Sequence, residues 1–200
     1  ERVSNIVVMG SGEPMDNYDN IVKFVKIISS DMGLNISQRN ITVSTCGIVP
    51  KIRELADEGL SITLALSLHA PNDEIRKTIM PVANKYALKD VISACDYYFK
   101  KTGRRVSYEY SLVAGINDNI KEAMNLVKLV NGRNIHINLI PVNPIKERDF
   151  KQSDKLKIKE FKDFLEKKGV NATVRREMGR DIDGACGQLR RRFIQSERNS

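Results

Sequence analysis

Short apolar runs and longer amphipathic stretches alternate along the whole chain. The apolar runs predict strands over residues 5–10, 40–45, 61–68, 105–112, 135–140 and 172–175. Between them, apolar residues recur with helical spacing over residues 17–32, 49–58, 73–80, 88–101, 119–130 and 153–168. No hairpin turn joins two of the strands, so the alternation predicts an α/β fold built on a parallel or barrel-like sheet.

Polar residues gather where these predicted strands end. In chain order they are Gly12, Glu13, Ser44, Thr45, Ser67, His69, Asn143 and Cys186. In parallel α/β architectures, ligands bind at the carboxyl ends of the strands. We therefore expect these residues to lie on one rim of the sheet and to form one site.

Length, charge and cysteine content indicate how many domains the chain forms, what charge its partners carry and whether its thiols are reduced. The chain has 200 residues, which suits a single domain with a substantial core. Its net charge of +8 favours a polyanionic partner, although many proteins of this charge bind none. Three cysteines far apart in sequence favour reduced thiols and a cytoplasmic location. The sequence has no apolar run of membrane-spanning length and no secretory signal.

Cys186 is the strongest candidate for covalent chemistry. It stands between Ala185 and Gly187 after the last predicted strand, where small neighbours allow a substrate or cofactor to approach a nucleophilic sulfur. Arginines surround it in the sequence, namely Arg175, Arg176, Arg180, Arg190, Arg191, Arg192 and Arg198. Arginine pairs with phosphate and stacks on bases, so the segment favours a polyphosphate partner over a merely solvated basic face.

The other motifs leave alternatives open. The glycines around Ser11 lack the third glycine of a dinucleotide fingerprint, so by itself this motif is more simply a turn with a solvated Glu13. His69 is equally compatible with a ribose or carboxylate contact and with a turn histidine bonded to backbone. Two prolines stiffen residues 140–144, which either present Asn143 as a fixed donor and acceptor or simply connect two elements.

Three further polar or sulfur side chains are expected to be packed. His136 alternates with isoleucines on a strand and is expected to be a wall residue with its hydrogen bonds satisfied. Cys95 lies at helical spacing from apolar residues and is expected in the core, and Cys46 is expected to be a small packed residue. No His/Cys cluster has metal-ligand spacing, so the chain itself is expected to ligate no metal.

Five motifs taken together resemble the RlmN/Cfr family of radical S-adenosylmethionine (SAM) enzymes, which methylate adenine in ribosomal RNA. They are MGSGEP at residues 9–14, STCGIVP at 44–50, SLHAPNDE at 67–74, NLIPVNP at 138–144 and DIDGACGQL at 181–189. Each is weak alone, but five in order over nearly the whole chain are specific. The resemblance implies a partial (βα)6-type barrel that lacks its first strand, with a radical SAM core over residues 1–189 and a basic tail over residues 190–200.

The resemblance also implies cofactors and residue roles. The cofactors are SAM and a [4Fe–4S] cluster. Gly12 and Glu13 would bind the SAM amino group, and the rest of its pocket would be lined by Ser44, Ser67, Leu68, His69 and Asn143. Cys186 would take a methyl group from one SAM. A 5′-deoxyadenosyl radical from a second SAM would then activate that methyl group for addition to adenine, through a covalent RNA–protein adduct.

The implied substrate is C2 of an adenosine in 23S rRNA, and also an adenosine in tRNA. The implied protein partner is an electron donor such as flavodoxin or ferredoxin. No membrane partner is implied, and the protein is expected to be a monomer. The alternatives are C8 methylation, as in the Cfr branch, and a non-catalytic α/β RNA-binding module. An ordinary barrel enzyme that uses Glu13 and His69 as acid and base is less favoured, because nothing in the sequence pairs them.

The sequence departs from the family pattern in three places. The CxxxCxxC loop that ligates the cluster and the second catalytic cysteine are absent, and Ser11 stands where methionine is usual. We therefore expect this chain to be an excised piece of a longer protein that carries the missing cysteines and an RNA-binding domain upstream. By itself the piece is expected to be inactive.

Overall fold

A computed structural model describes residues 3–10, 12–142 and 150–175 of the chain. Its centre is an all-parallel, six-stranded sheet in the order β1-β2-β3-β4-β5-β6. The strands are Ile6–Val8 (β1), Ile41–Thr45 (β2), Thr63–Ser67 (β3), Val106–Leu112 (β4), Ile135–Pro141 (β5) and Ala172–Val174 (β6). All six expected strands are confirmed.

The helices alternate with the strands as expected. They are Tyr18–Ser29 (α1), Val49–Asp57 (α2), Asp73–Ile79 (α3), Leu88–Thr102 (α4), Ile120–Val130 (α5) and Lys155–Lys167 (α6). Side chains at several first turns satisfy amide groups that a helix leaves free: Asn72 accepts from Ile75, and Asn119 accepts from Glu122. Among the described residues, no helix is long and apolar enough to cross a membrane.

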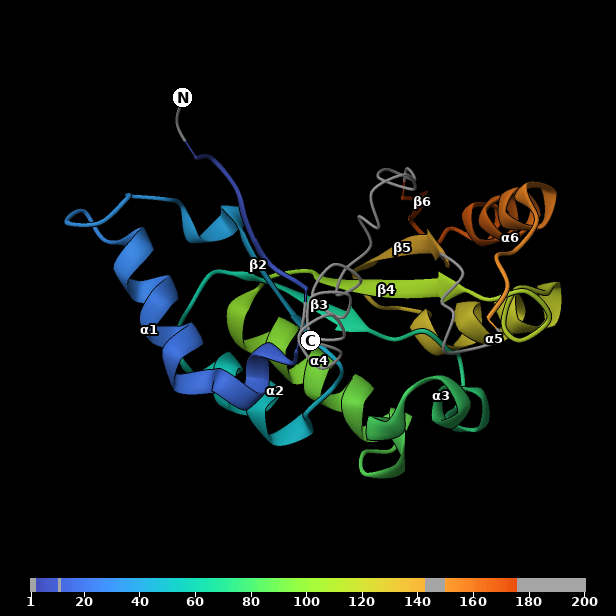
Figure 1. Ribbon diagram of the computed structural model, residues 1–200, viewed down its shortest axis with the longest axis horizontal. Coiled ribbons are helices and arrows are strands. Elements are labelled where there is room, and N and C mark those ends of the chain that lie inside the picture. Colours follow the sequence, from blue (N-terminus) through green and yellow to red (C-terminus); the bar gives the residue numbers. More distant parts are fainter. Residues whose placement is uncertain (1–2, 11, 143–149, 176–200) are drawn as a thin grey trace, which may run out of the picture.

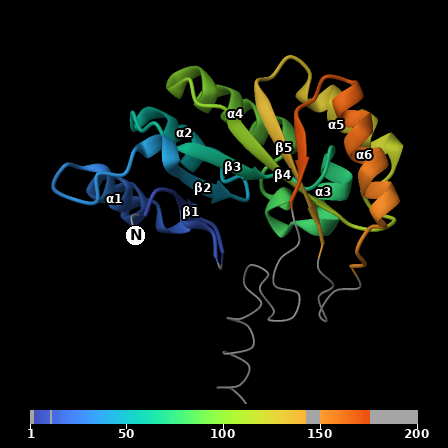
Figure 2. The same cartoon turned by 90° about the horizontal axis from the view of Figure 1, so that it is seen from above.

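The helices form a layer on one side of the sheet, and the strands fan out beside it from β1 to β6 (Figures 1 and 2). Alternate strand residues, such as Val43, Leu66 and Tyr108, are fully buried in the core on the helix side. A tilted ring contact of 5.5 Å between Tyr110 and Phe161 joins β4 to α6. The residues in between point to the opposite face of the sheet, which carries none of the helices described above.

The sheet is open. Within the described ranges, β1 pairs only with β2 and β6 only with β5, so the two edge strands do not meet. The expected α/β fold with a partial parallel barrel is therefore confirmed. The expected boundary between the core and the basic tail, at residues 189 and 190, lies outside the described residues.

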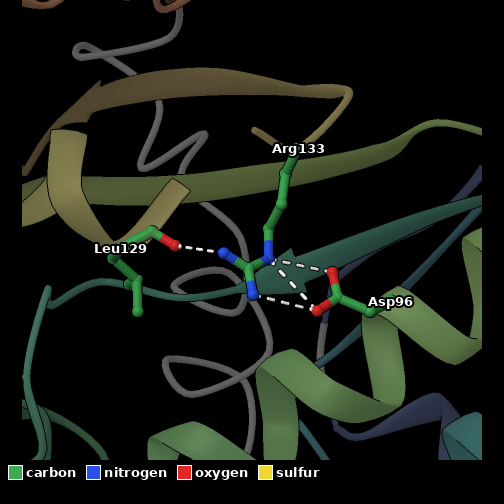
Figure 3. Close-up of polar contacts among 3 residues, drawn as sticks. All are labelled: Asp96, Leu129 and Arg133. Atoms are coloured by element: carbon green, nitrogen blue, oxygen red, sulfur yellow. Dashed lines mark hydrogen bonds and ion pairs between the residues drawn. The ribbon is translucent and has the colours of Figure 1, made fainter. Parts of the chain in front are cut away.

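An ion pair between Arg133 and Asp96 connects two helices of the layer at the amino end of the strands (Figure 3). Arg133, two residues before β5, donates from Nε to Asp96 Oδ1 at 2.9 Å and from Nη2 to Asp96 Oδ2 at 3.0 Å. Its Nη1 also donates to the carbonyl oxygen of Leu129 at 2.7 Å. The guanidinium thus joins α4 to the last turn of α5, at the end of the sheet remote from the predicted site.

Candidate functional site

Glu13 ties the turn after β1 to the end of β2. Its Oε2 accepts from the backbone N–H of Cys46 at 2.7 Å, and its Oε1 accepts from the N–H of Met15 at 3.1 Å. Ser44 adds a second tie, because its hydroxyl donates to the carbonyl oxygen of Val8 at 3.1 Å. Glu13 is therefore held in place and is not the solvated turn carboxylate that its own motif favoured.

Gly12 leaves open space beside this fixed carboxylate. Its φ is +98°, a conformation that L side chains rarely adopt, and a Cβ built there would meet nothing within 4 Å. The backbone at Gly12 can therefore be approached by a ligand whose polar end reaches Glu13.

Cys46 is a thiol at neutral pH. Burial, together with a hydrogen bond to Glu13, raises the pKa of the Cys46 thiol to about 12. Cys95 is 1 % exposed on α4, and burial raises the pKa of its thiol to about 12 as well. The expected core position of Cys95 is confirmed, and Cys46, expected to be a small packed residue, is partly buried.

Arg76 on α3 holds the carboxyl ends of β2 and β3 together. It is fully buried, and its Nη2 donates to the carbonyl oxygen of Cys46 at 2.6 Å while its Nε donates to that of Leu68 at 3.1 Å. Desolvation lowers the pKa of this guanidinium. Among the described residues, no carboxylate forms an ion pair with it, so backbone carbonyl dipoles stabilise its charge.

His69 follows β3 in a left-handed backbone conformation, with φ at +56°. Its N–H donates to the Glu109 carbonyl oxygen at 3.2 Å, and its ring Nδ1 accepts from the N–H of Ser111 at 3.0 Å. Its carbonyl oxygen accepts from Asn117 Nδ2 at 2.8 Å. Burial and the nearby charge of Arg76 lower the pKa of His69 to about 4, so the ring is neutral at pH 7.

A polar row runs across the helix-free face of the sheet beside His69. Strand register places Ser67 next to Glu109, Glu109 next to Asn138, and Asn138 next to Thr173. Asn138 Nδ2 donates to Glu109 Oε2 at 2.9 Å, and burial raises the pKa of that carboxyl group. This face therefore offers a continuous set of hydrogen-bonding groups to a polar ligand.

The structure brings most of the predicted site residues to one rim. Those at the carboxyl ends of their strands are Gly12, Glu13, Ser44, Ser67, Leu68 and His69. The Leu68 side chain is fully buried, so this residue presents only its backbone, and Thr45 faces the core, where its hydroxyl accepts from the N–H of Gly47. Asn143 and Cys186 lie outside the described residues.

Sequence reasoning missed Arg76, Glu109 and Asn117. The strict alternation of residues 106–112, in which Ser107, Glu109 and Ser111 interrupt apolar positions, is a signal that could have placed Glu109 on the polar face. No comparable signal marks Arg76, because its role depends on carbonyl groups that only the fold brings together.

No metal centre occurs in the part of the chain that the structure describes. Within residues 3–10, 12–142 and 150–175, no group of three or more His, Cys, Asp or Glu side chains could hold a metal ion. The described residues therefore provide no ligands for an iron–sulfur cluster, and the expectation that such ligands lie elsewhere stays a prediction.

Comparison with known proteins agrees with this geometry. Residues 1–127 match the family model described as Radical SAM superfamily. The chain is 66% identical over 195 residues to a probable dual-specificity RNA methyltransferase RlmN of Lachnospira eligens, covering 98% of the chain and 56% of that protein. It is 69% identical over 193 residues to the protein of that name from Lachnoclostridium phytofermentans, covering 96% of the chain and 54% of that protein.

A solved structure supports the same relationship. The crystal structure of a radical SAM methyltransferase from Sphaerobacter thermophilus has a TM-score of 0.90 and 43% identity to this chain, covering 94% of the chain and 55% of that protein. The chain thus spans about half the length of the relatives it matches. Together these matches confirm the resemblance to the RlmN/Cfr family, and the chain belongs to the radical SAM superfamily.

Proposed function

We propose that the chain is the SAM-binding and catalytic part of a methyltransferase that modifies C2 of adenosine in 23S rRNA and in tRNA. The observation that carries the proposal is the identity of 66% and 69%, over almost the whole chain, to proteins called dual-specificity RNA methyltransferase RlmN. The excess of 33 Lys and Arg over 25 Asp and Glu suits an RNA partner. Such an enzyme acts in the cytoplasm with an electron donor such as flavodoxin or ferredoxin.

SAM and a [4Fe–4S] cluster are the cofactors of this superfamily, and the described residues fit the first of them. The Glu13 oxygens each accept one backbone N–H and retain a lone pair for an ammonium group. The open space at Gly12 admits the methionine end, and the polar row from Ser67 to Asn138 suits the nucleoside end. Ser44, Leu68 and Asn143 are proposed to complete the pocket.

Cys186 is proposed to carry the methyl group. Its thiolate sulfur would attack the methyl carbon of SAM, and the bond from that carbon to the sulfonium would break with its electron pair leaving on S-adenosylhomocysteine. The thiol proton passes to solvent. The cluster and a second SAM supply the one-electron chemistry that activates the S-methyl group for addition to adenine. A target adenine must be unstacked to be reached, which suits a loop of RNA.

The decisive experiment follows an isotope from SAM to protein and RNA. The full-length, cluster-loaded protein is incubated with rRNA and SAM labelled in the methyl group, and both products are digested for mass spectrometry. We expect labelled Cys186 and labelled 2-methyladenosine. Cys186→Ala should reduce RNA methylation to background, whereas Cys95→Ala, a change in the core, should retain it.

The other outcomes separate the alternatives. Labelled 8-methyladenosine in place of 2-methyladenosine would assign the C8 branch. RNA binding without label in either product would identify a non-catalytic RNA-binding module. Methylation that persists in Cys186→Ala would remove Cys186 from the mechanism.

A further inference from the structure

We infer that Asn117 is a positioning residue that fixes His69 in one ring tautomer, with Nε2–H presented as a donor to an acceptor oxygen of the bound nucleoside cofactor. The inference rests on the proposed function for the identity of that cofactor, SAM. Its structural basis is a set of hydrogen bonds that converge on the segment from Leu68 to Ala70 at the end of β3.

The Asn117 side chain can adopt only one orientation. It is fully buried, its Oδ1 accepts from the N–H of Val113 at 2.7 Å, and its Nδ2 donates to the carbonyl oxygens of Ser111 at 2.7 Å and His69 at 2.8 Å. The Asn117 carbonyl oxygen accepts from the hydroxyl of Tyr110 at 3.0 Å. If the amide were flipped, its NH2 group would face the N–H of Val113 and its oxygen would face the two carbonyl oxygens. The network therefore selects the observed rotamer.

This amide stabilises a strained backbone at His69. A residue other than glycine at φ +56° costs roughly 1 kcal/mol, and the bond from Asn117 to the His69 carbonyl oxygen helps to hold it there. The left-handed turn directs the ring toward β4, where Nδ1 meets the N–H of Ser111. Asn117 also bonds the segment Ser111–Val113 at both ends: it donates to the Ser111 carbonyl oxygen and accepts from the Val113 N–H. It therefore positions the Ser111 N–H donor as well as the His69 backbone.

The tautomer of His69 follows from these contacts. Nδ1 accepts from an amide N–H and therefore bears no proton, which leaves the single proton of a neutral ring on Nε2. The low pKa of His69, about 4, keeps the ring neutral at physiological pH. No partner for Nε2 occurs among the described residues, so this donor is available to a hydroxyl or carboxylate oxygen of a ligand.

The test exchanges one atom of the Asn117 side chain. Asn117→Asp keeps the shape and the acceptor for Val113 but removes the donor to His69, and it sets a carboxylate oxygen against two carbonyl oxygens. Asn119→Asp is the matched control, because it makes the same exchange in the same loop while aspartate remains a good N-cap for α5. Both are compared with wild type in the full-length, cluster-loaded protein.

Two readouts distinguish positioning from general stability. In ¹⁵N-histidine spectra the His69 signal, assigned by its loss in His69→Gln, should show the Nε2–H tautomer in wild type and Asn119→Asp. In Asn117→Asp the His69 signal should shift toward a mixture of the Nε2–H and Nδ1–H tautomers. SAM affinity measured by calorimetry should fall about tenfold in Asn117→Asp, the order expected for one lost hydrogen bond, with kcat at saturating SAM within about twofold of wild type.

A second pair of variants does not depend on Asn117→Asp folding. His69→Gln places an amide N–H near the position of Nε2 and should retain most of the affinity for SAM, whereas His69→Phe should lose about tenfold. Equal affinities for these two, or an unchanged His69 tautomer in folded Asn117→Asp, would overturn the inference. The tautomer and SAM-affinity readouts need no RNA and no labelled Cys186, so they can succeed or fail independently of the methyltransferase assignment.

Discussion

His69 combines two interpretations that its sequence context left as alternatives. Its ring is bonded to backbone through Nδ1, as in a turn histidine, while Nε2 has no partner among the described residues and is proposed to meet a ligand. Arg76 could not be found in the same way, since arginine is rarely fully buried, least of all where, as among the described residues here, no carboxylate forms an ion pair with it. Residues that follow strand ends can be read from a sequence, but residues that act by bonding distant carbonyl groups require the fold.

The neutral state of the partly buried His69 makes stability depend on pH. Its pKa is about 4 in the folded chain against 6.5 for the free side chain, so below pH 6.5 the unfolded state binds the proton first. The contribution of His69 is complete above pH 6.5 and is lost as the pH falls toward 4. The free energy of unfolding of wild type relative to His69→Gln should drop by roughly 3 kcal/mol between pH 7 and pH 4.

Urea unfolding of both proteins across this range measures that difference. Taking the difference cancels groups that titrate in both, among them Glu109, whose raised pKa acts with the opposite sign. Parallel stability curves for the two proteins would show that His69 titrates normally in the folded state.

At the level of elements, the hydrophobic pattern was sufficient to predict the order of strands and helices, but not the contacts that form the candidate site. Each expected strand and helix is present within a few residues of its predicted ends, because buried parallel strands and amphipathic helices have distinct periods. The pattern did not reveal that the loop of residues 113–119 folds back on His69. That contact depends on the strand order and on a left-handed turn, neither of which has a periodic signature.

Gly47 lies where β2, α3 and α4 meet, and its substitution tests this junction. A Cβ there would lie 3.0 Å from Val91 Cγ1 and 3.2 Å from Arg76 Nη2, at a φ of +104°. Gly47→Ala should lower the free energy of unfolding by about 3 kcal/mol, from backbone strain and overpacking together.

Gly59→Ala is the control for backbone strain alone. Gly59 also has a positive φ, +69°, but a Cβ there meets nothing within 4 Å, so the expected cost is about 1 kcal/mol. Chemical denaturation of both variants gives the comparison. Equal losses would mean that the junction adjusts to the methyl group and does not fix the position of Arg76.

On the scale of the whole molecule, the end of the sheet that carries the proposed cofactor site lies opposite an end that carries the Asp96–Arg133 ion pair. Glu13, Arg76 and His69 lie at the carboxyl ends of the strands, while the Asp96–Arg133 pair lies at the amino end (Figure 3). An α/β fold of this kind could be predicted from the sequence because at least one helix separates every two consecutive strands. The helix-free polar face could not be assigned residue by residue, since register is a property of paired strands.

This separation predicts that stability and cofactor binding respond independently to changes at the amino end. Arg133→Gln disrupts four hydrogen bonds of the guanidinium in a half-exposed setting, so we expect a loss of about 1 kcal/mol in the free energy of unfolding. SAM affinity should stay within about twofold of wild type. Thermal unfolding and calorimetry on one preparation measure both quantities, and a parallel fall in affinity would indicate that the two ends are coupled.

The protonated thiol of Cys46 has a consequence for any protein that holds a sulfonium alkylating agent. Such a reagent can alkylate any nearby nucleophilic side chain, and alkylation of the protein would consume the reagent. With a pKa of about 12, Cys46 is ionised at neutral pH in roughly one molecule in a hundred thousand. Desolvation raises this pKa most, and the hydrogen bond and negative charge of Glu13 raise it further, so the fixed carboxylate also keeps the neighbouring sulfur protonated. Cys46 and Cys95 therefore both stay protonated at neutral pH and would not compete for an alkylating cofactor.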